Sequence, residues 1–215
     1  MPLIAATAAD VVAAEKFLSR RDPVMKKLIA SYKPCTLVGP QRDPFHVLCT
    51  SIVSQQLSVK AADTIQGRVM TLVGAKKLLK PVHINDAEHD DLRACGLSHA
   101  KARWLRALAE QVRDGTFSFI KLKRMDDEAA IEALDALPGI GRWTAEMYLI
   151  FALHRLDIFA MGDVGLRNCI NKLYNDGVAL NVEETLTITD RWAPYRSVAS
   201  WYLWRVIDGD IQNFK

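Results

Sequence analysis

The sequence predicts an all-α protein. Apolar residues recur at helical spacing along most of its 215 residues, and Ser, Thr or Asp precedes several of these segments as a helix cap would. No alternation of apolar and polar residues is long enough to require a sheet. Because half of the residues are hydrophobic, the chain can bury a substantial core. We expect two helical lobes, one formed by residues 1–40 and 155–215 and the other by residues 41–154.

The expected helices begin at recognisable caps. Thr7 can cap a helix over residues 8–20, and the pairs Asp22-Pro23 and Asp43-Pro44 open the next two, since proline suits a first helical turn. Ser58 and Ser98 can cap helices further on, and Gly96 is a plausible terminator of a short helix that starts at Asp86. The remaining helices are expected at 59–72, 98–112, 126–136, 142–153, 164–174, 182–192 and 196–207.

Composition limits the class of protein without identifying it. The net charge of +3 and the pI near 8.7 permit nucleic acid as a partner but do not require it. The four cysteines, Cys35, Cys49, Cys95 and Cys169, are scattered without a C-x-x-C pair, so we expect buried free thiols rather than disulfides, zinc or an iron–sulfur cluster. With no secretory signal and no membrane-length apolar run, we expect a cytoplasmic protein, associated with the nucleoid or, in a eukaryote, nuclear.

A tight connection, Leu137-Pro138-Gly139-Ile140-Gly141, joins two of the expected helices within residues 127–153. Pro138 stops the first helix, while Gly139 and Gly141 permit positive φ and a close approach of a ligand to the backbone. The amide groups at the start of the second helix favour an anion such as a DNA phosphate. A plain helix–turn–helix without a ligand is the alternative, and the hairpin alone does not decide between them.

The residues around the hairpin extend this pattern into a family resemblance. Leu137-Pro138-Gly139-Ile140-Gly141-Arg142-Trp143-Thr144-Ala145, followed by Gly162-Asp163-Val164, resembles the helix–hairpin–helix (HhH-GPD) DNA glycosylases, and within them the 3-methyladenine DNA glycosylase II (AlkA/MAG) branch. The chain looks like a compact form, too short for an N-terminal β domain and without the four-cysteine cluster loop of iron–sulfur relatives. Three further segments agree: Ile52-Val53-Ser54-Gln55-Gln56-Leu57-Ser58, Gly96-Leu97-Ser98 with Lys101, and Trp192-Ala193-Pro194-Tyr195-Arg196-Ser197 with Trp204.

The resemblance implies excision of alkylated bases such as 3-methyladenine and 7-methylguanine from double-stranded DNA, in an active-site cleft between the lobes. Asp163 would be the catalytic carboxylate that stabilises positive charge on the sugar, although an Asp at this place can also simply cap the next helix. Lyase relatives carry a Lys where this chain has Trp143, so we expect a monofunctional glycosylase. The expected base pocket contains Trp143, Met147, Trp204 and Trp201.

The resemblance also implies how DNA is held. Gln56 would fill the space left by the flipped base, with Gln55, Leu57 and Ser58 beside it, although Gln55-Gln56 can also be read as a polar helix end. The main-chain carbonyls of Asp135, Leu137 and Ile140 would hold a structural Na⁺ or K⁺, and no other cofactor is expected. The hairpin residues expected to contact the DNA backbone are Gly139, Ile140, Gly141, Arg142 and Thr144.

Three other functional hypotheses remain besides excision of alkylated bases: a non-catalytic DNA-binding module, a glycosylase for oxidised or mismatched bases, and an all-α scaffold without a nucleic-acid role. A monomer suffices for the expected chemistry. We expect the basic side chains of Lys101, Arg103 and Arg106 to form a solvent-exposed helix face. We expect the lone His46 to be a packing or surface residue. Arg196 can either approach the surroundings of Asp163 or bind helix carbonyls, and the sequence does not separate these roles.

Overall fold

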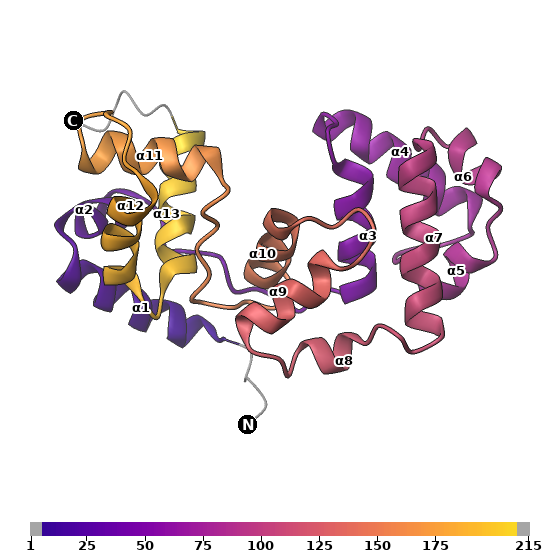
Figure 1. Cartoon of the computed structure of the whole chain (residues 1–215), viewed down its shortest axis with the longest axis horizontal. Coiled ribbons are helices and arrows are strands. Elements are labelled where there is room, and N and C mark those ends of the chain that lie inside the picture. The colour runs from indigo at the N-terminus through magenta and orange to yellow at the C-terminus, as the bar shows by residue number, and fades with distance from the viewer. Residues whose placement is uncertain (1–5, 210–215) are drawn as a thin grey trace. The chain divides into compact units, whose positions relative to one another are not determined.

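The computed structural model describes residues 6–209, and this part of the chain is helical, with no strand. Two compact units divide it. Unit 1 is the continuous segment Gln41–Tyr148, whereas unit 2 combines residues 6–40 with residues 149–209. Figure 1 shows the helices in order along the chain. The predicted all-α class is therefore confirmed.

Unit 1 is organised around the long helix α7 (His99–Arg113), which buries Ala102, Leu105, Leu108 and Ala109 along one face. Helices α3, α5 and α6 pack against α7, and α4 packs against α3 and α6. A short connection then leads from α9 into α10, and the boundary of the unit falls within α10. The other helices of this unit are α3 (Pro44–Ser54), α4 (Val59–Leu72), α5 (Pro81–Asn85), α6 (His89–Ala94), α8 (Phe119–Leu122), α9 (Asp127–Asp135) and α10 (Arg142–Phe151).

Unit 2 is organised around α13 (Arg196–Asp208), which is buried along most of its length. Helices α1, α2 and α11 pack on it, together with a single 3-10 turn, η1 (Asp190–Trp192). Chain segments from both ends of the sequence thus share one core. The other helices of this unit are α1 (Ala8–Arg21), α2 (Pro23–Ser31), α11 (Val164–Tyr174) and α12 (Val182–Thr189).

Two carboxylates, the buried Asp22 and the half-buried Glu15, join the helices of unit 2. Asp22 is 1% exposed; its Oδ1 caps α2, and its Oδ2 accepts hydrogen bonds from the Tyr174 hydroxyl and the Trp192 indole, both at 2.9 Å. Glu15 Oε1 likewise accepts from the Tyr202 hydroxyl at 2.6 Å and from the backbone N–H of Cys35 at 2.9 Å. Each carboxylate therefore satisfies buried donors that would otherwise destabilise the fold.

The predicted caps are present. Thr7 forms a capping box with Asp10 at the start of α1, and Asp22 and Asp43 cap helices that begin with proline. Ser58 and Ser98 accept hydrogen bonds from the first turns of α4 and α7. Gly96 follows α6 with φ +107°, as a terminating glycine does.

Several predicted boundaries were wrong. Asp86 does not start a helix: it closes the short α5, which was not predicted, and α6 begins three residues later at His89. The helix expected to reach residue 192 ends at Thr189 and tightens into η1. Helix α10 ends at Phe151 rather than at residue 153, and α8 was not predicted.

The four cysteines are buried free thiols, as predicted. Burial raises the pKa of Cys35 and of Cys169 to about 12, so both thiols stay protonated near neutral pH. None of the helices in residues 6–209 combines the length and the apolar character needed to cross a membrane.

Candidate functional site

The hairpin of unit 1 contains two glycines that differ in conformation and surroundings. Gly139 adopts φ +82°, and a Cβ there would overlap the indole of Trp104 on α7, coming within 2.8 Å of its Cγ. Gly141 is not in the left-handed region, contrary to the expectation for both glycines, and has no atom within 4 Å of an added Cβ. Gly139 is thus required by packing, whereas Gly141 leaves open space in front of α10.

Around these glycines the hairpin is anchored by apolar burial. Leu137 and Ile140 are each 4% exposed, and the Ile140 N–H donates to the Leu137 carbonyl at 3.1 Å. Asp135 is the last residue of α9. The carbonyl groups at this helix end carry partial negative charge, which is the oxygen-donor chemistry that a monovalent cation requires.

In the first turn of α10 the exposed side chain of Arg142 is bound by two carboxylates. The Arg142 guanidinium binds both carboxylate oxygens of Glu128 on α9, at 2.6 and 2.8 Å, and its Nε lies 3.2 Å from Glu146. Hydrogen bonding to Glu128 raises the pKa of Arg142, and the same contact lowers the pKa of Glu128. The Arg142 side chain is therefore occupied by two carboxylates of the same unit. On the same helix Trp143 is 50% exposed, while Thr144 and Met147 are half-buried.

In the connection between α3 and α4, one glutamine is exposed to solvent and the other is hydrogen-bonded within unit 1. Gln56 and Leu57 are exposed, and Gln56 has φ +57°. Gln55 is half-buried, and its Nε2 donates to the Gly139 carbonyl at 2.8 Å. Ser58 accepts the Ala61 N–H as the cap of α4. Within unit 1 the structure thus brings the Gln55–Ser58 turn and the hairpin into direct contact.

Lys101 corrects one expectation. It is not part of a solvated helix face, because its Nζ donates to the carbonyls of Val53 and Gln55 at 2.8 and 2.6 Å. Burial lowers the pKa of its ammonium group. Its neighbour Arg103 is exposed, as expected. The place of Lys101 in the family-like segment after Gly96 was the signal in the sequence that could have distinguished it from the solvated face.

In unit 2, Asp163 caps α11. Its Oδ1 accepts the Leu166 N–H at 2.9 Å, and its Oδ2 accepts the Trp204 indole N–H at 3.4 Å. A Cβ at Gly165 would come within 3.2 Å of Oδ1, so the missing side chain there leaves room for the carboxylate. The capping role foreseen for Asp163 is present, and it fixes the direction of the carboxylate.

Aromatic rings lie next to this carboxylate. Trp204 of α13 packs against Phe151 with ring centroids 5.5 Å apart, and Phe151 was not predicted as a site residue. Trp201, one turn before Trp204, is 9% exposed, and the Arg205 guanidinium lies 5.3 Å from its ring centroid. Trp204 is therefore the tryptophan of α13 that contacts Asp163, and Trp201 is mostly a core residue.

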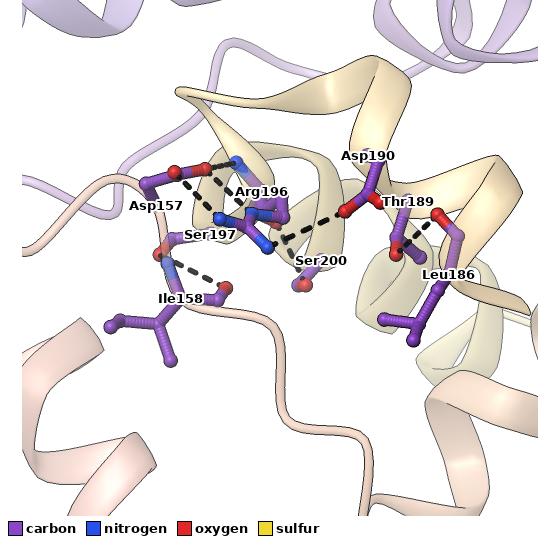
Figure 2. A network of polar contacts seen from close by, with 8 residues as sticks. All are labelled: Asp157, Ile158, Leu186, Thr189, Asp190, Arg196, Ser197 and Ser200. Atoms are coloured by element: carbon purple, nitrogen blue, oxygen red, sulfur yellow. Dashed lines mark hydrogen bonds and ion pairs between the residues drawn. The ribbon is translucent and has the colours of Figure 1, made fainter. Parts of the chain in front are cut away.

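The segment that leads to Asp163 is fastened to the start of α13 (Figure 2). The Arg196 guanidinium binds both carboxylate oxygens of Asp157, at 2.8 and 2.9 Å, and its Nη1 lies 3.7 Å from Asp190. The Ser197 hydroxyl accepts the Ile158 N–H at 2.9 Å. These contacts give Arg196 the role that the sequence left open: it holds the loop before Asp163 through Asp157.

Comparison with known proteins identifies the family. The model of the HhH-GPD superfamily of base excision DNA repair proteins matches residues 49–194. The chain therefore belongs to the HhH-GPD superfamily of base excision DNA repair proteins.

Two individual relatives are similar to this chain over most of its length. The alkylbase DNA glycosidase-like protein mag2 of Schizosaccharomyces pombe is 32% identical, over 92% of this chain and 94% of that protein. DNA-3-methyladenine glycosylase 1 of the same yeast is 34% identical, over 83% of this chain and 78% of that protein.

Solved structures agree with these relatives. A DNA-3-methyladenine glycosidase from Bacillus halodurans superposes with a TM-score of 0.85 at 35% identity, covering 94% of this chain and 92% of that one. The S. pombe 3-methyladenine DNA glycosylase Mag1, solved with abasic DNA, gives a TM-score of 0.73 at 33% identity, covering 91% and 97%.

Proposed function

We propose that this protein is a monofunctional DNA glycosylase that removes alkylated purines, such as 3-methyladenine and 7-methylguanine, from double-stranded DNA. It hydrolyses the N-glycosidic bond and leaves an abasic site for base excision repair. The observation that carries the proposal is the Asp163 carboxylate, held between the N-terminus of α11 and the Trp204 indole in a chain of the HhH-GPD superfamily.

In the proposed reaction the bond between C1′ and the base nitrogen breaks, and its electron pair leaves with the base. A purine alkylated at N3 or N7 carries a positive charge, so it departs as a neutral base without prior protonation. The sugar becomes an oxocarbenium ion, which the Asp163 carboxylate stabilises. Water then adds to C1′ and loses its proton to Asp163 or to solvent. The two hydrogen bonds to Asp163 fix the carboxylate before the charge develops, so little reorganisation is needed.

We assign recognition of the base to aromatic and soft apolar side chains: Trp143 and Met147 of α10, and Trp204 and Trp201 of α13. A cationic purine stacks favourably on an electron-rich indole. Because Trp143 has no amine, it cannot form the Schiff base that strand-cutting relatives use, so the phosphodiester strand stays intact.

We assign the grip on the DNA backbone to the hairpin. The open space at Gly141 lets a phosphate reach the backbone amides at the start of α10, which favour an anion. The carbonyls of Asp135, Leu137 and Ile140 would hold a Na⁺ or K⁺ that reinforces this grip. Gln56, exposed at its turn, would occupy the place of the flipped base. Nothing in this scheme requires a second copy of the chain.

The proposal is tested by measuring base release from duplex DNA treated with a methylating agent. Wild type should release 3-methyladenine and 7-methylguanine, with strands that break only after heating in alkali. Asp163→Asn should release at least about 100-fold less, because the charge on the sugar is no longer compensated, yet fold normally, because asparagine is also a good helix cap.

The matched control is Asp176→Asn, the same substitution at an exposed position with φ +51° that asparagine tolerates, and it should behave as wild type. Equal release by wild type and Asp163→Asn would refute the catalytic role. DNA binding without any release would favour the non-catalytic module. Faster release of 8-oxoguanine than of methylated purines would favour an oxidised-base enzyme.

A further inference from the structure

The turn that carries Gln56 is backbone-strained. Gln55 has φ −50° and ψ 130°, Gln56 has φ +57°, and the Leu57 N–H donates to the Ser54 carbonyl at 3.2 Å. These values match a type II β-turn, whose third residue is normally glycine or asparagine because its φ is positive. A glutamine persists there only if the surrounding structure holds the turn.

Lys101 supplies part of that support from α7. Its ammonium group binds the carbonyl of Val53, in the last turn of α3, and the carbonyl of Gln55, within the turn itself. The last carbonyls of a helix lack intrahelical partners and carry partial negative charge, so a cation stabilises them. Lys101 therefore fixes the turn at both sides of Ser54.

The second support is Gln55, which joins the turn to the hairpin. Its amide donates to the Gly139 carbonyl at 2.8 Å across 84 residues of sequence. Gly139 is itself packed against Trp104, one turn after Lys101 on α7 and therefore on the same side of that helix. One helix thus holds both the turn and the hairpin.

Packing alone does not fix the turn. A hollow of about 220 Å³ lies against it, lined in part by Gln55, Leu57, Ile65 and Lys101. A turn beside such a hollow has no packed side chains on that side, so polar contacts must hold it. The hydrogen bonds from Lys101 and Gln55 are polar contacts of this kind.

We infer that Lys101 and Gln55 are positioning residues that hold Gln56 as the DNA-inserting side chain and couple its position to the hairpin. This inference rests on the proposed function. It gives Gln55 a role inside the protein rather than a contact with DNA. The hairpin keeps its own anchors in Leu137, Ile140 and Trp104, so loss of Lys101 should displace Gln56 and leave the phosphate-binding backbone in place.

The test reads insertion directly, without depending on catalysis. A duplex carries a tetrahydrofuran abasic analogue with 2-aminopurine opposite it, and saturating protein is added at a temperature where every variant is folded. Wild type should change the 2-aminopurine fluorescence, and Gln56→Ala should abolish most of that change. Lys101→Met should also lose most of it, Lys101→Arg should keep it, and the exposed control Arg103→Met should match wild type. Gln55→Leu should resemble Lys101→Met.

Base release from methylated DNA is measured in single turnovers with the same variants. Lys101→Met should lower the maximal rate about tenfold to 100-fold, with affinity for undamaged duplex changed by less than about threefold. If Lys101 acts through Gln56, the double variant Lys101→Met/Gln56→Ala should be no slower than Gln56→Ala alone.

A wild-type fluorescence response in Lys101→Met, or full additivity in the double variant, would overturn the inference. Absence of base release by wild type, with fluorescence that still depends on Gln56 and Lys101, would instead refute the proposed function and support the inference.

Discussion

Gly139→Ala should destabilise the protein by about 2–5 kcal/mol. An alanine at φ +82° costs about 1–2 kcal/mol relative to an ordinary conformation. Its Cβ would also overlap several ring atoms of Trp104, and overfilling of this kind costs about 1–3 kcal/mol. The ring cannot yield freely, because the overlap reaches Cγ, the ring atom nearest to the Trp104 backbone.

Urea unfolding followed by circular dichroism measures this loss, and Gly141→Ala is the matched control. Gly141 has no positive φ and no neighbour within 4 Å of an added Cβ, so its alanine variant should range from unchanged to about 1 kcal/mol more stable. Its defect should appear in DNA affinity instead, since the methyl group blocks the approach of a phosphate.

The overlap with Trp104 can be separated from the cost of the positive φ. In the double variant Gly139→Ala/Trp104→Ala the ring is absent, so the combined loss should fall short of the sum of the single losses by about 1–3 kcal/mol. A loss below about 1 kcal/mol for Gly139→Ala, or equal losses for the two glycine variants, would show that Trp104 does not dictate the glycine.

Two further predictions concern side chains that accept hydrogen bonds from residues distant in the sequence. Asp22→Ala should lower the free energy of unfolding in urea by about 3–6 kcal/mol, because it removes a helix cap and leaves the donors of Tyr174 and Trp192 unpaired. The control Asp126→Ala removes an exposed cap and should lower it by only about 1 kcal/mol. His46 Nδ1 accepts the Leu79 N–H, and burial lowers the pKa of His46 below its usual 6.5. In the unfolded chain His46 has its usual pKa of 6.5 and so binds a proton more readily than in the folded protein. The contribution of His46 to the free energy of unfolding should therefore be complete above pH 6.5 and be lost as the pH falls through the lower pKa of the folded state. His46→Asn, which retains an acceptor, should lack this part of the pH dependence; identical pH profiles would contradict the assignment.

The starts of helices could be predicted because capping is local. Thr7, Asp22 and Asp43 each lie within three residues of the amides that they bind. The short helices α5 and α8 could not be predicted in this way, since five and four residues do not form a stable helix alone. Packing in unit 1 holds α5, which lies directly against α7, and α8 buries Leu122.

In the candidate site, too, contacts between near neighbours in the sequence could be predicted, and contacts between distant residues could not. The motif containing Asp163 could be found from consecutive residues, and so could its capping bond. The partners of Lys101 and Arg142 could not, because Lys101 binds carbonyls 46 and 48 residues away and Arg142 binds a carboxylate 14 residues away. From the sequence alone a basic residue on a helix is predicted to be solvent-exposed, because only the fold shows which acceptor lies next to it.

The split of unit 2 between both ends of the chain has a consequence for synthesis on the ribosome. The bonds from Trp192 to Asp22 and from Tyr202 to Glu15 close loops of 170 and 187 residues. Helices α1 and α2 leave the ribosome before the rest of unit 2, but Asp22 cannot reach Trp192 until η1 has emerged, and Glu15 cannot reach Tyr202 until α13 has emerged. Unit 1, which is continuous, can complete its core earlier. During that interval α13 does not yet cover the apolar residues of α1 and α2, which include Leu18, Met25 and Leu28, so this helix pair is open to chaperones and to premature association.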